Sequence, residues 1–531
     1  MSSLDPRAAR DKAATGSDQS GSALSGAPPP TGRTELLKRA AIALSLANLC
    51  FLYVWGDILH TWDNNATLYL TGGRLESSAV WALLVDIGIF AAIVFLLLCL
   101  RKSRSRPLAY TATALIVLIC LYAVYRLQNS INPALYGHFG RNLISYLRYA
   151  VIVAIAIYAI RRPRKALNGL RRLLLILSSL IFVFLAQALW LCYGVHRQQL
   201  GPQIAASAVP LNSGHHARAI WIIFDEFDKR MAFDDRPARI QMPHFDALRR
   251  VSIFGEQVKS PAHNTRAAVP SLLLSKVIPT NEDFDLNSRP VRVRFSGCSR
   301  YVSLASQPNI FRRARALGFN TAVSGWYHPY CQLFAGDLNA CASQNGEFGY
   351  LRKHPHLYQK AMFLANLEVR QMPLLPGRLA WLDPLSASKF ISRAHREVLK
   401  YVLKSGEKML EDRNLNLVFL HLPIPHPPGI WDAFRQRFTD GQSDYVDNLA
   451  LADRILGKLE RILRRTGDWD RSTVLVSSDH PYRPSLWLGP SATGEMVRIT
   501  HRQWQPYIPF ILKMPGQKTG IVYSREFNSV L

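Results

Sequence analysis

Five long apolar runs dominate the first third of the chain. They lie near residues 40–56, 78–100, 107–126, 143–160 and 173–195. Each is close to the ~20 residues with which an α-helix crosses a bilayer, and five buried helices of a soluble protein are the weaker alternative. We therefore expect a five-helix transmembrane domain over residues 34–196. Residues 1–33 are rich in Ser, Gly, Ala and Pro and lack apolar periodicity, which predicts a disordered tail.

Basic residues orient these runs. They precede the first run, follow the second, and separate the fourth from the fifth, as Arg33, Lys38, Arg39, Arg101, Lys102, Arg104, Arg106, Arg161, Arg162, Arg164, Lys165, Arg171 and Arg172. Lys and Arg mark cytoplasmic loops, so the N-terminus is predicted to be cytoplasmic. The loops at 57–77 and 127–142, and all of the chain after Val195, are predicted to lie on the other side. A cleaved signal peptide is disfavoured because a long polar tail precedes the first run.

The net charge adds little beyond topology. There are 64 Lys and Arg against 37 Asp and Glu, a formal charge of +27, and 49% of the residues are hydrophobic. Many of the basic residues flank the apolar runs, and no basic stripe is interleaved with aromatic residues. We therefore exclude nucleic acid as a partner.

The seven cysteines show no zinc-type CxxC spacing. Cys50, Cys99, Cys120 and Cys192 fall in the apolar runs and are expected to be small core residues. In an oxidising compartment Cys331 and Cys341 can close a short loop, which leaves Cys298 unpaired.

From Ala219 onward, short apolar runs alternate with amphipathic stretches. The expected strands are Ile220–Phe224, Asn320–Val323, Leu415–Leu420, Thr473–Ser477 and Ile508–Lys513, and the expected helices are 242–250, 309–317, 386–411 and 445–465. This alternation is typical of an α/β fold with a mostly parallel sheet flanked by helices. We assign residues 197–217 to a linker and 218–531 to a catalytic ectodomain.

Two pairs of possible metal ligands come just after predicted strands, where ligands of such sheets bind. They are Asp225 with Glu226, and Asp479 with His480. Carboxylate and imidazole ligands with an open position suit a divalent metal ion, with zinc preferred and manganese, magnesium or calcium as alternatives. Either pair alone could instead cap a helix or turn.

A polar loop at 262–266 leads into an apolar helix and carries Thr265. At a helix N-terminus the free amides favour anions, and a bound metal lowers the pKa of a hydroxyl. Thr265 is therefore the candidate nucleophile and a further metal ligand. The alternative is that Thr265 is a simple N-cap.

Three histidines also follow predicted strands: His421 and His426 in a Pro-rich loop, and His328 after the 320–323 strand. They are candidates for binding substrate oxygens, for metal binding or for protonating a leaving group. Ordinary packing in the loops is the alternative.

These elements, in this order over roughly residues 218–515, resemble the sulfatase and alkaline-phosphatase superfamily. Ile-Phe-Asp-Glu resembles its acidic metal-binding start, residues 265–275 its nucleophile loop and helix, and Gly-Trp-Tyr-His its Gly-Lys-Trp-His segment. His426 resembles the substrate histidine of Pro-His-x-Pro, residues 445–453 the helix before the last ligand strand, and Asp479-His480 the late metal pair. With five preceding spans, the chain is similar to the phosphoethanolamine transferases and lipoteichoic-acid synthases of bacterial membranes.

The sequence departs from the sulfatase pattern at three positions. Thr265 stands where sulfatases convert Cys or Ser to formylglycine, Trp326 replaces the sulfate-binding Lys, and Pro481 replaces the usual Gly after Asp-His. Threonine is the nucleophile of the lipid-dependent phosphotransferases, so the resemblance implies phosphotransfer rather than sulfate-ester hydrolysis.

The resemblance implies an enzyme in a bacterial inner membrane with a periplasmic C-terminal domain. It would transfer a phospho-substituent, of the phosphoethanolamine or phosphoglycerol type, from a membrane phospholipid donor to an exported lipid or glycan acceptor. Two alternatives remain open: an ester hydrolase, phosphodiesterase or sulfatase, that uses the same site, and a catalytically silent sensor or scaffold.

Overall fold

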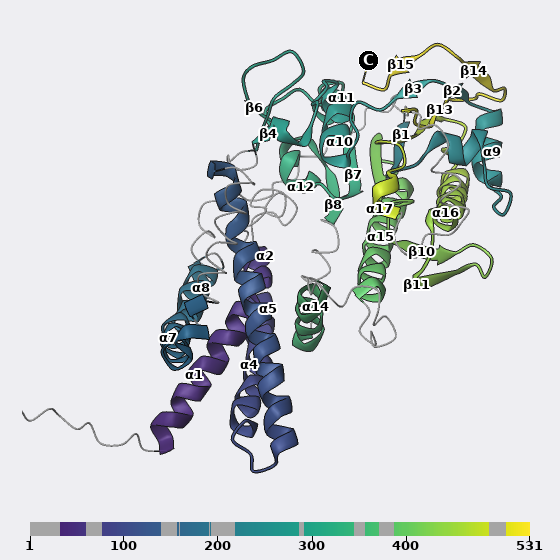
Figure 1. Cartoon of the computed structure of the whole chain (residues 1–531). Coiled ribbons are helices and arrows are strands. Elements are labelled where there is room, and N and C mark those ends of the chain that lie inside the picture. Colours follow the sequence, from purple (N-terminus) through teal and green to yellow (C-terminus); the bar gives the residue numbers. More distant parts are fainter. Residues whose placement is uncertain are drawn as a thin grey trace, which may run out of the picture.

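The computed structural model describes residues 32–59, 77–139, 157–158, 160–190, 192, 218–285, 291–344, 356–370, 387–487 and 506–530. Apart from residues 32 and 33, the predicted tail lies outside the described residues, as does the predicted linker at 197–217. Long helices from the first third of the chain gather at one end, and a sheet with flanking helices forms the other (Figure 1).

An eight-stranded sheet forms the centre of the C-terminal part. Its strands are β1 (Arg218–Phe224), β2 (Ile253–Gly255), β7 (Thr321–Trp326), β8 (Ala340–Gln344), β9 (Leu417–Leu422), β12 (Ser472–Ser478), β13 (Phe510–Lys513) and β14 (Ile521–Tyr523). They lie in the order β14-β2-β13-β12-β1-β9-β7-β8. From β12 to β8 neighbouring strands are parallel, whereas β13 is antiparallel to both of its neighbours. The predicted α/β fold with a mostly parallel sheet is confirmed.

Helices cover both faces of this sheet because its central strands are apolar on both sides. Ile222 and Phe224 of β1 join one hydrophobic core with α9 (Pro243–Arg250), α15 (Ala387–Glu411) and α16 (Tyr445–Arg465). Ile223 points to the other face and joins a second core with α10 (Thr265–Leu274), α11 (Ile310–Ala316) and α12 (Tyr330–Leu333). The alternation along β1 follows from the two-residue period of a strand.

Short elements complete this part. They are the hairpin of β10 (Gly429–Asp432) and β11 (Arg437–Ser443), the small sheet of β4 (Phe284–Asp285), β5 (Arg292–Val293) and β6 (Val302–Ser303), the pair of β3 (Val258–Lys259) and β15 (Phe527–Asn528), and α17 (Pro484–Trp487).

The helices of the first third are α1 (Gly32–Cys50), α2 (Leu52–Leu59), α4 (Ser77–Leu100), α5 (Arg106–Phe139), α7 (Pro163–Leu177) and α8 (Leu180–Leu189). Within the described residues, three helical stretches are long and apolar enough to cross a membrane: Ser77–Leu100, Arg106–Asn129 and Pro163–Leu189. The sequence predicted five such helices, and these three correspond to its runs at 78–100, 107–126 and 173–195.

The predicted runs at 40–56 and 143–160 are not among these three stretches, for two different reasons. The run at 40–56 is helical but is divided at Phe51 between α1 and α2. It lies in the interior of the bundle, where Asn48 accepts a hydrogen bond from Trp55 Nε1 at 2.8 Å, so protein rather than lipid surrounds its polar side chains. The run at 143–160 lies almost wholly outside the described residues. The predicted loop from 127 is also wrong up to Phe139, because α5 continues through it.

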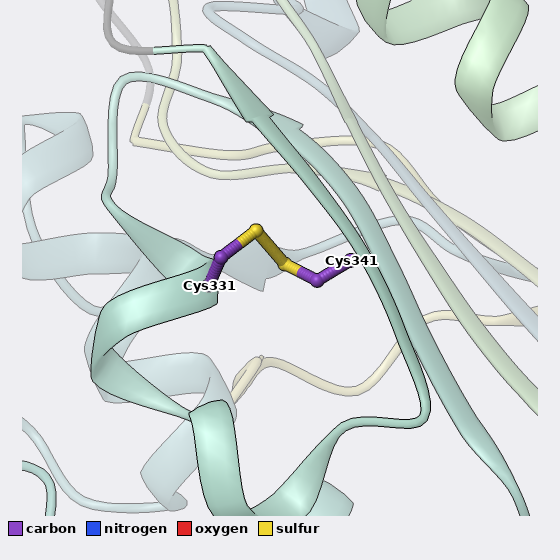
Figure 2. The surroundings of a disulfide bond; sticks show 2 residues. All are labelled: Cys331 and Cys341. Atoms are coloured by element: carbon purple, nitrogen blue, oxygen red, sulfur yellow. A yellow bond between two sulfur atoms is a disulfide. The ribbon is translucent and has the colours of Figure 1, made fainter. Parts of the chain in front are cut away.

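A disulfide joins Cys331 of α12 to Cys341 of β8, as predicted (Figure 2). Its Cα atoms are 5.6 Å apart and the bridge closes a separation of 10 residues. Cys298 is free and exposed. The bridge ties α12, which carries Tyr330, to an edge of the sheet.

Replacing both Cys331 and Cys341 with Ser is expected to destabilise this part by about 2 to 3 kcal/mol, because a short closed loop no longer restricts the unfolded chain. Thermal unfolding of the detergent-purified protein should show a midpoint about 5 °C lower. Cys298→Ser is the matched control and should leave the midpoint unchanged. Equal midpoints for the double variant and wild type would contradict a stabilising bridge.

Candidate active site

The predicted acidic residues meet at the carboxyl ends of neighbouring parallel strands. Phe224 of β1 is in register with Ser478 of β12, so Asp225 and Asp479 each follow directly at the same edge of the sheet. The backbone N–H of Glu226 donates to Asp479 Oδ1 at 3.1 Å, which fixes the two strand ends to each other. Both aspartates are fully buried.

Thr265 begins α10 beside these carboxylates. Asn264 is the N-cap, since its side chain accepts the backbone N–H of Ala267 at 3.1 Å, so the alternative of Thr265 as a simple cap is wrong. Thr265 Oγ1 lies 3.2 Å from Asp225 Oδ2 and 3.2 Å from His480 Nε2. The hydroxyl thus points into the acidic cluster at the start of a helix, where negative charge is favoured.

Asp225, His421 and Asp479 are buried, and each offers one possible metal-ligand atom. These atoms all lie within 4.8 Å of one another. His480 adjoins this set, with Nε2 3.7 Å from Asp225 Oδ1 and 3.4 Å from Asp479 Oδ2. Two buried carboxylates are costly without a compensating positive charge. The arrangement is therefore chemically suited to a cation.

The hydrogen bonds of the site fit a divalent metal ion. Asp479 Oδ2 and His421 Nε2 are buried and have no hydrogen-bond partner among the described residues. His480 Nδ1 lies 3.0 Å from Pro481 O; because a carbonyl only accepts, Nδ1 carries the hydrogen and Nε2 keeps its lone pair. Asp225, His421, Asp479 and His480 are thus the residues that could hold a metal ion.

The histidines also set the charge of Asp225. Burial alone raises the pKa of a carboxyl group, but His426, His421 and His480 together hold the pKa of Asp225 well below its usual range. Asp225 is therefore an ionised carboxylate at neutral pH, the form that binds metals and accepts protons.

Glu226 contacts Arg483 through one of its carboxylate oxygens. Its Oε1 accepts the backbone N–H of Arg483 at 2.6 Å and lies 3.4 Å from the Arg483 guanidinium. Its φ of 64° is unusual for a non-glycine residue and re-aims the side chain. Burial raises the pKa of Glu226 to about 8, against the attraction of Arg483. Of the predicted metal ligands, it is the one that contacts a cationic side chain, while its Oε2 is buried and has no hydrogen-bond partner among the described residues.

His328 is fully buried, and its Nε2 donates to Thr265 O at 2.9 Å. Burial lowers the pKa of His328 to about 3, so the ring is neutral at physiological pH. The sequence predicted a substrate contact for this residue. In the structure its ring binds the backbone carbonyl of Thr265.

His426 borders the cluster and is partly exposed. Its backbone N–H donates to Asp225 O at 3.1 Å, and its Nδ1 donates to Pro427 O at 2.7 Å. Asn448 of α16 secures the loop by donating to Pro425 O at 3.2 Å and to Pro428 O at 3.1 Å. His426 is thus held rigidly next to Asp225.

Sequence reasoning missed three residues that build the site. Tyr330 OH lies 2.7 Å from His421 Nδ1, Asn448 secures the His426 loop, and Arg483 binds Glu226. Asn448 lies within residues 445–453, which resemble the helix before the last ligand strand, and Tyr330 follows His328 by two residues. Both residues could therefore have been found by their position near predicted site segments. Nothing in the sequence marked Arg483.

Tyr330→Phe is expected to weaken metal binding about 10- to 100-fold, because Tyr330 fixes the ring of His421 through its second nitrogen. Titration of the metal-free protein with zinc, followed by calorimetry, measures the change. Tyr301→Phe, which removes an exposed hydroxyl far from the cluster, is the control. If Tyr330→Phe binds zinc as tightly as wild type, the result would contradict a role for His421 as a metal ligand oriented by Tyr330.

No family model matches the sequence, and no curated protein matches it significantly. Solved structures do show a likeness. The solved structures that match include a sulfatase from Pseudoalteromonas and a protein in the alkaline phosphatase superfamily.

Three solved structures illustrate the likeness. They are a phosphonate monoester hydrolase from Silicibacter pomeroyi (14% identity, TM-score 0.37, 59% of this chain and 71% of that chain), a protein in the alkaline phosphatase superfamily from Vibrio parahaemolyticus (11%, 0.33, 63% and 68%), and the lipoteichoic acid synthase LtaP from Listeria monocytogenes (12%, 0.34, 59% and 69%). At these TM-scores the likeness carries no argument about substrate or residue roles. Those rest on the geometry above.

Proposed function

We propose that this protein is a membrane-anchored, metal-dependent phosphotransferase of the sulfatase-like type. It takes a phospho-substituent, of the phosphoethanolamine or phosphoglycerol type, from a membrane phospholipid onto Thr265 and passes it to an exported lipid or glycan. The observation that carries the proposal is the placement of Thr265 Oγ1, 3.2 Å from both Asp225 Oδ2 and His480 Nε2 at the start of α10.

The first half of the reaction forms one bond and breaks one. Thr265 Oγ1 attacks phosphorus, and the bond from phosphorus to the diacylglycerol oxygen breaks. The proposed acceptor of the hydroxyl proton is Asp225 Oδ2, 3.2 Å from Thr265 Oγ1, because the lone pair of His480 Nε2 would be used by the metal ion. The leaving oxygen takes a proton, for which the partly exposed His426 is the proposed donor. In the second half an acceptor hydroxyl gives its proton to His426 and its oxygen attacks phosphorus. The bond from phosphorus to Thr265 Oγ1 breaks, Oγ1 regains its proton from Asp225, and the enzyme is restored.

A divalent cation held by Asp225, His421, Asp479 and His480 would lower the pKa of the attacking hydroxyl and offset the charge on the phosphoryl oxygens. Zinc is the preferred ion because two imidazoles and two carboxylates are typical zinc ligands. Manganese, magnesium or calcium are alternatives. His328 keeps Thr265 in position through its carbonyl, and Glu226 keeps Arg483 close to the site.

We further propose a bacterial inner membrane as the location, with a cytoplasmic N-terminus and a periplasmic catalytic part. Three helices with the length and apolar character of membrane spans support membrane attachment. The Cys331–Cys341 disulfide supports an oxidising compartment for the catalytic part. Phospholipid donors are available in that membrane.

Reconstitution tests the proposal. The purified protein in liposomes is given phosphatidylethanolamine or phosphatidylglycerol, and diacylglycerol release is measured with and without a glycan or lipid acceptor. Transfer predicts diacylglycerol release together with a head group attached to the acceptor. Release of free head group at a rate independent of any acceptor would instead identify a hydrolase. No turnover and no bound metal would leave a binding protein.

A further inference from the structure

A short helix from the catalytic part of the sequence lies among the membrane helices. This helix, α14 (Leu357–Arg370), follows β8 in the chain but stands beside α4 and α5 in Figure 1. Ala361 and Leu364 are buried in the same hydrophobic core as α1, α2 and α4. One face of α14 is thus packed against the bundle.

A buried ion pair fastens this face. Arg126 of α5 donates from Nη2 to Glu368 Oε2 of α14 at 3.3 Å, its Nε lies 2.8 Å from Oε1, and both side chains are only 3–4% exposed. Tyr122 OH also donates to Glu368 Oε1, at 2.5 Å. At the other end of α14, Lys360 Nζ donates to Ser78 Oγ at 2.6 Å. Polar contacts therefore tie both ends of α14 to two membrane helices.

The residues that α14 contacts indicate how deeply it lies in the membrane. Tyr122 and Arg126 lie within the membrane-spanning stretch Arg106–Asn129, and Ser78 lies in the first turn of Ser77–Leu100. These are the ends that the distribution of basic residues places on the outer side. The 14 residues of α14 extend about 21 Å, which is less than the ~30 Å of hydrocarbon in a bilayer. The helix can enter the outer leaflet but cannot cross.

A second strip of α14, about 120° around the helix from the buried side chains, is apolar and exposed. Tyr358, Met362 and Val369 are 61%, 38% and 46% exposed, and at 100° per residue they lie within about 40° of one another around the helix. An exposed apolar strip on a helix that is docked at the level of the membrane spans fits hydrocarbon as its partner.

We propose that α14 is a membrane-inserted helix of the catalytic part, held in the outer leaflet by the Glu368–Arg126 ion pair, and that Tyr358, Met362 and Val369 contact the acyl chains of phospholipids. The continuous core with the membrane helices and the apolar outer strip carry this inference. It holds whichever group the active site transfers, and its tests do not measure activity.

Photo-crosslinking in liposomes tests the lipid contact. Benzoylphenylalanine is introduced at Tyr358 or at Met362, and in the control at Tyr523 of β14, which is 43% exposed at the far edge of the sheet. After irradiation, mass spectrometry should find phospholipid adducts at positions 358 and 362, several-fold above position 523. Lipid adducts no more frequent than at 523, or adducts to a second protein chain, would overturn the proposal.

The ion pair is tested separately. Glu368→Leu and Arg126→Leu each leave one buried charge without its partner, whereas the double variant leaves none. We expect each single variant to unfold at a lower temperature than the double variant in detergent, and to lose lipid adducts at position 358 that the double variant retains. If the single variants unfold at the same temperature as wild type and keep their lipid adducts, the ion pair does not hold α14 in place.

Discussion

Replacing Thr265 with alanine is expected to lower turnover by about 10³-fold or more while the fold stays intact. The hydroxyl is the attacking group in the proposed reaction, and no other hydroxyl among the described residues is bonded to both Asp225 and His480. Asn264, rather than Thr265, caps α10, so the loss of the hydroxyl costs the helix little. Diacylglycerol release in liposomes measures turnover, and thermal unfolding reports the fold.

Two variants make this result specific. Thr265→Ser keeps a hydroxyl on the same backbone position and should retain part of the activity. Thr280→Ala removes a threonine that caps a short helix outside the site, and should cost about 1 kcal/mol of stability without affecting turnover. Activity of Thr265→Ala within a few-fold of wild type would remove Thr265 from the chemistry.

Replacing Asp479 with asparagine is expected to weaken binding of a divalent metal by about 100-fold or more and to abolish turnover at ordinary metal concentrations. Asp479 is fully buried and contributes one of two carboxylates to the cluster, and its Oδ2 has no hydrogen-bond partner among the described residues. In wild type, saturating metal should stabilise the folded protein by about 4 kcal/mol at 1,000 times the dissociation constant.

Metal content by mass spectrometry and thermal unfolding with and without a chelator measure these effects. Asp470→Asn is the control, because Asp470 is an exposed carboxylate paired with Lys518. A chelator that shifts the unfolding of wild type and of Asp470→Asn, but not of Asp479→Asn, is the expected pattern. Equal metal content in all three proteins would place the metal elsewhere.

The parts of the site that follow strands could be predicted from sequence. Asp225 and Asp479 follow two short apolar runs with the pattern of buried strands, and the carboxyl ends of parallel strands meet at one edge. Thr265 was found because a polar loop leads directly into an apolar helix. The five predicted strands are all in the sheet, whereas β2 and β14, with three residues each, are too short to leave a periodic signal.

Side-chain direction could not be predicted from sequence. Glu226 follows Asp225 directly, but a positive φ turns its carboxyl group toward Arg483. His421 was a candidate for binding either substrate or metal, and the sequence could not show that its Nε2 lies 3.4 Å from Asp225 Oδ2, within the set of possible metal-binding atoms. The Tyr330–His421 hydrogen bond joins segments 91 residues apart, and no local pattern encodes such a contact.

The membrane part shows the same limit. Composition identified the apolar runs, but it could not show that the run at 40–56 is divided between α1 and α2 in the interior of the bundle. It also gave no sign that α14 returns to these helices. That return depends on Glu368 meeting Arg126, 242 residues away.

The most direct test of the central claim is mass spectrometry of the intact protein and of the peptide that contains Thr265, purified in detergent from its native host. In wild type we expect a covalent adduct on Thr265 with the mass of a phosphoethanolamine or phosphoglycerol group, and none in Thr265→Ala. An unmodified Thr265 in protein that turns over phospholipid, or an adduct on another residue, would contradict the proposed phosphotransfer through Thr265.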